Sequence, residues 1–426
     1  ATQADSVHLQ NADGSYRVVN TSVISGGTYK AGDLQFGDFN GDSNVDILQL
    51  KRSVVRRTVQ VSSKRVGHHC GMGGCISWKY IPIMGTRQET IYTPSIYTGD
   101  GAGRFSLSST SPSIPFIKDI IQPRVLIGGS PNGGPIYSPS VWTNSHNNQR
   151  LHIADFTGDG KDDILYLGND PSPQANHFTA RLYVADASTT GFTQAPDSRI
   201  VFSIRSGTGT ENDLDRFRVG DFNGDGMADL YWITNGNDKV FLSDGRGTFY
   251  QKTGPYTYVG GREGNIAIDL ARVKFADFNG DGITDIMREA NGCDCNAPVR
   301  VALGKGDGQF TSWVNAGFNT GSEKDANDGT SDQSRILFGD FNGDGRTDVY
   351  YALTQGLIYL SRGDGTFTRQ NAPIGITHHI GDENKSAHTD LARLHVVDSN
   401  GDGYSDFHRL NNTAHIIYIN QNKPAL

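Results

Sequence analysis

Apolar residues recur at every second position beside six short acidic segments of this chain. The six lead-ins read LQFGDF (34–39), LHIADF (151–156), FRVGDF (217–222), VKFADF (273–278), ILFGDF (336–341) and LHVVDS (394–399). The residues that follow, such as DILQL (46–50) and DLYWI (229–233), show the same β-branched and aromatic bias. Alternation with a period of two is typical of half-buried strands. Each acidic segment is therefore predicted to join two strands, A and B, of a β-hairpin.

A second hairpin follows five of these segments and supplies strands C and D. Its copies lie at 96–105, 182–192, 240–249, 301–310 and 358–367. The last four acidic segments lie 56, 63 and 58 residues apart, close to the length of a four-stranded propeller blade. The predicted fold class is all-β: a β-propeller of four-stranded antiparallel blades, as a single domain over 1–426.

The two ends of the chain predict how the propeller closes. Residues 7–19 resemble strands C and D without A and B, and residues 415–426 resemble a strand C that lacks its D. In the simplest closure, residues 15–19 complete the last blade, which gives six blades. Seven blades would result if residues 107–150 held a degenerate A–B pair.

The six acidic segments share the composition of a cation-binding loop. Each has nine residues, with Asp at positions 1, 5 and 9, and five copies have Gly at position 6. Ca²⁺ takes six to eight oxygen ligands, which EF-hand loops supply from alternate residues around a turning glycine. A turn alone does not require Asp at three fixed positions. We therefore expect up to six Ca²⁺ ions, with side chains at positions 1, 3, 5 and 9 and the carbonyl of position 7 as ligands. These residues are Asp38, Asn40, Asp42, Asn44, Asp46, Asp155, Thr157, Asp159, Lys161, Asp163, Asp221, Asn223, Asp225, Met227, Asp229, Asp277, Asn279, Asp281, Ile283, Asp285, Asp340, Asn342, Asp344, Arg346, Asp348, Asp398, Asn400, Asp402, Tyr404 and Asp406.

With this DxNxDGxxD loop in an A–B–C–D frame, nearly the whole chain resembles the FG-GAP (VCBS-type) repeats. Such repeats form the propeller of integrin α-subunits and of fungal and bacterial propeller lectins. The resemblance implies a β-propeller with Ca²⁺ in the A–B loops. It does not imply a ligand, because one fold hosts many functions. The tryptophan-rich sugar pocket of the fungal lectins does not recur here, since the chain has only four Trp.

The long segments are the candidate ligand-binding surface. In an antiparallel blade the A–B and C–D turns share one rim, so the long insertions 51–93 and 107–150 belong to the other rim. Loops of this length are uncommon unless they are functional. Aromatic faces suit sugar rings or an apolar protein anchor, although the same residues could form a small core under the loops. The candidate ligand-binding residues are Trp78, Tyr80, Tyr92, Tyr137, Trp142, His378 and His379.

Four cysteines fall on this second rim. A disulfide between Cys70 and Cys75 would close a glycine-rich tip, whereas Cys293 and Cys295 would form a small, strained ring. Free thiols are one alternative, and zinc held by Cys70, Cys75 and a histidine of the same tip is another.

The net charge of the chain and its first residue indicate which partners and which location to expect. The formal net charge of −8 would become about +4 with six Ca²⁺ bound. The basic run KRSVVRR (51–57) is interpreted as a solvated strand edge, so no nucleic-acid partner is expected. No apolar run is long enough to span a membrane. The chain begins at Ala1, as a processed secreted protein would, and we expect a secreted or cell-surface protein.

Catalytic motifs are not evident in the sequence. It contains no G-x-S-x-G, HExxH or P-loop motif, and the polar cluster His378, His379, Asp382 and Glu383 is more typical of a solvated loop. The expected function is a calcium-binding recognition module, lectin- or adhesin-like, for a glycan or protein on the long-loop rim. The alternatives are a structural propeller in a larger secreted or toxin-type assembly, and a hydrolase or lyase with a rim active site. Nothing in the sequence indicates an oligomeric state.

Overall fold

The computed structural model of this protein describes residues 5–10, 16–21, 34–70, 75–100, 105–110, 118–121, 126–129, 135–137, 151–169, 177–186, 191–195, 200–203, 216–234, 237–255, 257, 270, 272–289, 298–319, 335–352, 356–371, 394–398, 402–410 and 415–418. No helix within these ranges has the length and apolar character needed to cross a membrane. The chain divides into two compact units. The first holds Ala1–Ser22, Ala154–Lys161 and Ala195–Leu426, and the second holds Val23–Ile153 and Asp162–Gln194.

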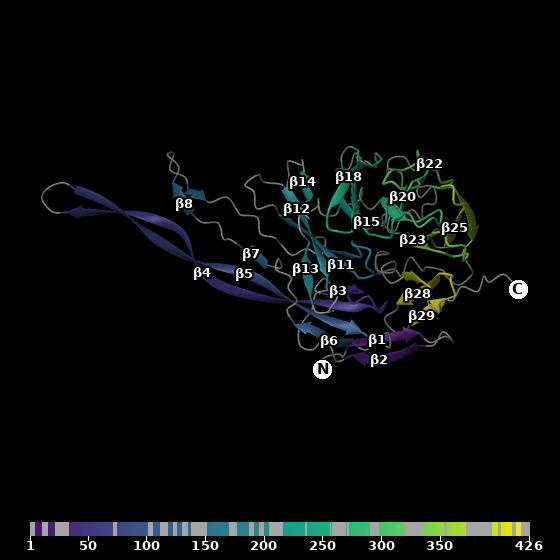
Figure 1. Ribbon diagram of the computed structural model, residues 1–426, viewed down its shortest axis with the longest axis horizontal. Coiled ribbons are helices and arrows are strands. Elements are labelled where there is room, and N and C mark those ends of the chain that lie inside the picture. The colour runs from purple at the N-terminus through teal and green to yellow at the C-terminus, as the bar shows by residue number, and fades with distance from the viewer. Residues whose placement is uncertain are drawn as a thin grey trace, which may run out of the picture. The chain divides into compact units, whose positions relative to one another are not determined.

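Three successive four-stranded antiparallel sheets form much of the first unit, and each confirms the predicted A–B–C–D order (Figure 1). Their strands are β15 (Phe217–Gly220), β16 (Asp229–Trp232), β17 (Lys239–Ser243) and β18 (Phe249–Thr253); β19 (Val273–Ala276), β20 (Asp285–Arg288), β21 (Arg300–Ala302) and β22 (Val314–Asn315); and β23 (Ile336–Gly339), β24 (Asp348–Tyr351), β25 (Leu357–Ser361) and β26 (Phe367–Asn371). In each sheet the acidic loop joins the first two strands. The all-β fold and the hairpin pattern therefore follow the sequence prediction.

The ends of the chain also lie in the first unit. The last sheet has three strands among the described residues, β27 (Leu394–Val397), β28 (Asp406–Leu410) and β29 (His415–Tyr418), and β14 (Ile200–Ser203) belongs to the same unit. Strands β1 (Asp5–Gln10) and β2 (Tyr16–Thr21) pair with each other. The predicted completion of the last blade by residues 15–19 is therefore not confirmed.

The second unit contains two further sheets with the same strand order. One is β3 (Leu34–Gly37), β4 (Asp46–Cys70), β5 (Cys75–Gly99) and β6 (Phe105–Thr110), with β7 (Lys118–Ile121) paired to β5; the other is β10 (Leu151–Ala154), β11 (Asp163–Asn169), β12 (His177–Ala185) and β13 (Phe192–Gln194). A short hairpin of β8 (Leu126–Gly129) and β9 (Pro135–Tyr137) lies within the 107–150 insertion.

The 51–93 insertion is regular, although the sequence suggests a long irregular loop. Strands β4 and β5 are each 25 residues long and continue past their sheet as a twisted two-stranded ribbon (Figure 1). The pairing runs from Ile47↔Tyr97 to Cys70↔Cys75, with one irregularity between Gln60 and Ser62.

The core lies between neighbouring sheets. The second strands β16 and β24 are buried along their whole length, because each is covered on both faces. The Phe at loop position 2 joins adjacent sheets: the Phe222 ring lies 5.5 Å from Tyr231 of its own sheet and 5.9 and 6.2 Å from Phe275 and Phe310 of the next. The equivalent Phe278 packs in the same way on the following sheet. Aromatic packing therefore fixes the positions of these two acidic loops.

Candidate metal centre

The Asp at position 1 of each acidic loop organises the backbone of that loop. In the third loop, Asp221 Oδ1 accepts the N–H of Asn223 at 3.2 Å and of Gly224 at 2.6 Å, and Oδ2 accepts the N–H of Gly226 at 2.9 Å. Equivalent bonds to positions 4 and 6 hold the loops that begin at Asp38, Asp155, Asp277 and Asp340. Asp398 accepts the N–H groups of Asp402 and Gly403. The five loops that the structure describes in full therefore share one conformation, and the described part of the sixth keeps the bond to position 6.

The turn at position 6 requires a left-handed backbone. Gly226 has φ of 81°, and Ser43 takes the same region in the first loop with φ of 65°. A residue with a side chain pays about 1–2 kcal/mol in this region. The first loop keeps the common conformation at that cost, although it lacks the glycine.

Positions 3, 5 and 7 form a second set of bonds. Asn223 Nδ2 donates to Asp225 Oδ2 at 2.7 Å, and Asp225 Oδ1 accepts the N–H of Met227 at 2.9 Å. The Asn–Asp bond recurs from Asn40, Asn279 and Asn342. The bond from the position-7 N–H recurs from Asn44, Lys161, Ile283, Arg346 and Tyr404. Thr157 replaces the Asn in the second loop, and Asn400 lies outside the described residues.

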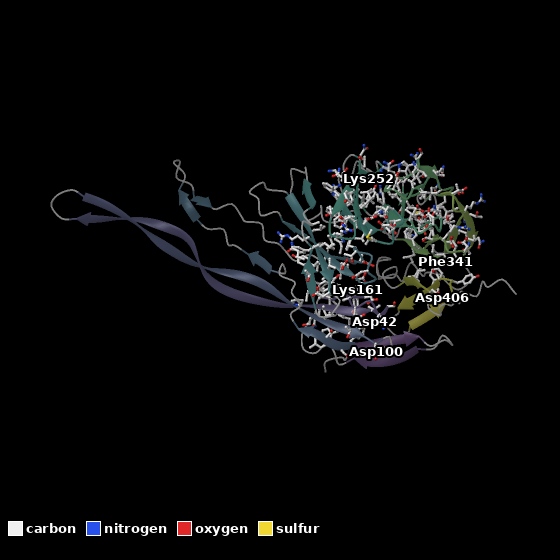
Figure 2. The ribbon with its side chains drawn as sticks, in the orientation of Figure 1. Asp42, Asp100, Lys161, Lys252, Phe341 and Asp406 are labelled. Atoms are coloured by element: carbon white, nitrogen blue, oxygen red, sulfur yellow. The ribbon has the colours of Figure 1, made fainter. Side chains whose placement is uncertain are left out.

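Two loops also carry a cation on the position-5 carboxylate. Lys161 Nζ lies 2.7 Å from Asp159 Oδ2, and Arg346 Nη2 lies 2.5 Å from Asp344 Oδ2. Partly exposed pairs of this kind contribute little to stability. They do place a positive charge on a carboxylate that a bound ion would also use. Figure 2 labels Lys161, together with Asp42 of the first loop and Asp406 of the sixth.

The Asp at position 9 is fully buried, in contrast to positions 1 and 5. Asp229 Oδ2 accepts the N–H of Phe222 at 3.0 Å, and its Oδ1 accepts the N–H of Ser243, at the end of the third strand, at 2.7 Å. Asp46, Asp285 and Asp348 make the same two bonds, and Asp163 makes the second. Burial raises the pKa of Asp229, Asp285 and Asp348 to about 7. Position 9 thus joins the loop to the third strand.

Backbone hydrogen bonds connect consecutive loops. The N–H at position 8 of one loop donates to the carbonyl at position 1 of the loop before it. In the second unit Asp162 donates to Asp38 at 2.7 Å. In the first unit the pairs are Ala228–Asp155, Thr284–Asp221, Thr347–Asp277 and Ser405–Asp340, at 2.6–2.8 Å. The same junction therefore recurs five times.

Side chains reinforce these junctions. A Cβ added at Gly224, a position-4 glycine, would lie 3.0 Å from Ile283 Cγ1, and one at Gly343 would lie 2.5 Å from the Tyr404 ring. The position-7 side chain thus covers the preceding loop. It leaves no room for a Cβ at position 4 of that loop, which explains the glycine there. Asp162 Oδ2 and Ser405 Oγ also accept the N–H at position 1 of the preceding loop. This role was not predicted from the sequence, although a recurrent Asp, Ser or Thr just before position 9 is its signal.

The loops suit Ca²⁺ by the chemistry of their side chains. Within the described residues, no group of three or more Asp, Glu, His or Cys side chains is placed to hold one ion. The carboxylates at positions 1 and 5 and the amide oxygen at position 3 are nevertheless the hard oxygen donors that Ca²⁺ prefers. Each carboxylate oxygen has two acceptor sites, so at position 1 the Oδ2 atom, which accepts one backbone N–H, keeps a lone pair for an ion, whereas both sites of Oδ1 are used. The metal roles of positions 1, 3, 5, 7 and 9 stay predictions.

The other predicted site residues are only partly within the described ranges. Trp78, Tyr80 and Tyr92 lie on β5, and Tyr137 ends β9. Cys70 and Cys75 are the outermost register partners of the ribbon, and their disulfide stays a prediction. Trp142, His378, His379, Asp382, Glu383, Cys293 and Cys295 lie outside the described residues.

Comparison with known proteins agrees with this geometry. A profile described as FG-GAP-like repeat matches residues 221–287 and 340–409. A lectin of Agrocybe aegerita, described as recognising non-reducing terminal N-acetylglucosamine, has a similar structure, with a TM-score of 0.58 and 17% identity over 99% of this chain and 86% of its own. The Tc holotoxin pore of Photorhabdus luminescens gives a TM-score of 0.34 and 14% identity, over 96% of this chain but only 21% of its own.

No curated protein matches the chain in sequence. At these low identities the structural likeness bears on the fold alone. Residues 221–287 and 340–409 therefore match FG-GAP-like repeats, and the consecutive sheets with their repeated acidic loops have a fold similar to that of the propeller lectin.

Proposed function

We propose that this protein is a calcium-binding β-propeller that recognises a glycan or a protein ligand outside the cell. The main support is the structural role of the acidic loops. Their side chains bond to their own backbone and to the neighbouring loop, so this part of the chain is a scaffold. Scaffolds of this kind carry binding residues on longer segments. Small calcium loops suit the millimolar calcium of extracellular fluids, which supports secretion or display at the cell surface.

The ribbon of β4 and β5, with strands of 25 residues each, is one such segment. Three predicted ligand-binding aromatic residues, Trp78, Tyr80 and Tyr92, lie on its second strand. Aromatic side chains offer large contact areas for sugar rings or for an apolar protein anchor. This concentration supports a ligand that contacts the ribbon.

A binding panel tests this function. Immobilised glycans and surface proteins should capture the calcium-loaded protein, and the double variant Trp78→Ala, Tyr80→Ala should lose at least about tenfold in affinity, because each aromatic anchor contributes 1 kcal/mol or more. Tyr250→Ala is the matched control, since Tyr250 is an exposed aromatic residue on β18. Equal binding by the double variant and the wild type would place the ligand elsewhere.

We also propose that six repeats close into a ring. Phe275 and Phe338 occupy one equivalent position of the first strand, and each packs on the preceding sheet. In the first repeat the same position holds Phe36, which is 58% exposed, and loop position 8 holds Val45, which is 57% exposed. This face of the first repeat is therefore suited to receive a preceding sheet, and the last repeat of the chain would supply it.

The substitution Phe36→Asp tests ring closure. If Phe36 is covered in the closed ring, the variant should lose about 2 kcal/mol or more of stability, because a charge replaces a buried ring. Leu107→Asp, at an exposed residue of β6 in the same sheet, is the control. Melting curves that are equally shifted for both variants would argue for an open chain of repeats.

A further inference from the structure

The ribbon formed by residues 51–93, here called the arm, differs in charge from the rest of the protein. It contains eight Lys and Arg and one acidic residue, Glu89, and so carries +7, whereas the whole chain carries −8. Residues 51–70 of β4 extend for about 65 Å at the rise of a strand. This length exceeds the Debye length of about 8 Å many times over. The acidic loop at the base of the arm therefore does not neutralise its outer part.

Cations and aromatic residues share one face of the arm. The register pairs Arg52 with Tyr92 and Arg65 with Tyr80. It also pairs Arg56 with Gln88. On β5, even numbers of residues separate Trp78, Tyr80, Gln88 and Tyr92 from one another. Alternate residues of a strand belong to the same face. Three arginines and three aromatic residues thus occupy one face, and Glu89 belongs to the other.

The second face brings two cations together. Arg57 and Arg87 are direct register partners. Like charges directly opposite each other destabilise a strand pair. An anion bound between or beside them would remove this repulsion, so the pair is a second feature that indicates an anionic partner.

Protection of the ribbon edges does not explain this pattern. The edges of a long ribbon need charged residues to prevent pairing with other chains. Charged residues of either sign would prevent such pairing, and a mixture of both signs would add attractive cross-strand pairs. A single sign instead indicates a partner of opposite charge.

The spacing of the cations indicates the class of partner. Eight cations along the arm amount to about one per 8 Å, whereas duplex DNA carries one phosphate per about 1.7 Å. Acidic polysaccharides carry one carboxylate or sulfate for each sugar or pair of sugars, which is a sparser charge. A flat membrane would meet one face only, but both faces of the arm carry cations. Sugar rings also suit the aromatic residues between the arginines.

We propose that the arm binds a linear acidic polysaccharide, with Arg52, Arg56 and Arg65 holding its anionic groups and Trp78, Tyr80 and Tyr92 its sugar rings. This inference rests on the proposed recognition function and names its ligand class. Because the contacts are ionic, binding weakens as salt rises.

The test uses labelled chondroitin sulfate, which carries sulfate and carboxylate, and hyaluronate, which carries carboxylate alone. At least one of them should bind the full chain, and neutral dextran should not. The triple variant Arg52→Gln, Arg56→Gln, Arg65→Gln should bind at least about tenfold more weakly. The control variant Arg246→Gln, Lys252→Gln, Lys305→Gln removes three exposed cations outside the arm and should bind like the wild type.

A second variant keeps the test valid if the triple variant does not fold. Arg87→Glu replaces the repulsion with Arg57 by attraction, so it should leave the melting temperature unchanged or higher while it weakens polysaccharide binding several-fold. Unaltered binding in both variants would overturn the proposal, and so would tighter binding to duplex DNA or to phosphatidylserine vesicles. Capture of neutral glycans or proteins without acidic polysaccharides would overturn this inference alone. A chain that binds no ligand would overturn the proposed function as well.

Discussion

Removing calcium should lower the melting temperature of this protein by about 10 °C or more. Each acidic loop brings three carboxylates together within nine residues, and without a cation these charges repel one another. One site filled at a hundred times its dissociation constant adds about 2.7 kcal/mol. In a large domain each 1 kcal/mol shifts the melting temperature by about 2–4 °C. Several filled loops therefore account for a shift of this size.

The measurement compares melting curves in excess chelator and in millimolar calcium, with metal content checked by elemental analysis. Calcium added back should restore the original curve, which separates metal loss from damage by the chelator. An unchanged curve in protein shown to be metal-free would mean that the hydrogen bonds of the loops suffice to hold them.

Substitution of the buried Asp229 by Ala should destabilise the metal-free protein by about 3–5 kcal/mol. The change leaves the N–H groups of Phe222 and Ser243 without their acceptors in the interior, and each buried unsatisfied group costs about 1–3 kcal/mol. The loss of packing adds to this cost. Asp229 therefore acts as a structural link whether or not an ion is bound.

Asp225→Ala in the same loop is the matched control. Asp225 lies on the exposed part of the loop, so its loss should cost less than about 1 kcal/mol in chelator and should show its main effect only with calcium. Urea unfolding of both variants in chelator provides the comparison. Similar, small losses for the two variants would mean that position 9 acts only as a metal ligand.

The repeated elements were predictable because their signals are local. Period-two alternation around DFNGDGMAD predicts the hairpin of β15 and β16, and the loop composition indicates a shared conformation. The partners of the position-9 carboxylate were not predictable, because Ser243 lies 14 residues further along the chain and meets Asp229 only when the third strand is in place. Likewise, β2 pairs with the nearby β1, which closes a short loop at low entropic cost.

The arm escaped prediction for a different reason. Alternation of polar and apolar residues marks a strand only when one face is buried. The VVRRTVQV stretch of β4 pairs only with β5, beyond which the short β7 adds a third strand at 88–91. Such a ribbon does not need an apolar face, and the stretch therefore resembles an irregular segment. Its register could only be obtained from the structure.

The junction between loops has a direction: the later repeat donates its amide and the earlier one offers its carbonyl. If one repeat were reversed in the array, two N–H donors would face each other at one of its junctions and two carbonyl acceptors at the other. A repeat copied in the same orientation, by contrast, would find a matching junction on both sides. Stability in such an array is close to a sum over repeats and their neighbours. The gene can therefore have lengthened by tandem duplication of whole units of some sixty codons, with each new copy free to diverge in the segments outside the junction.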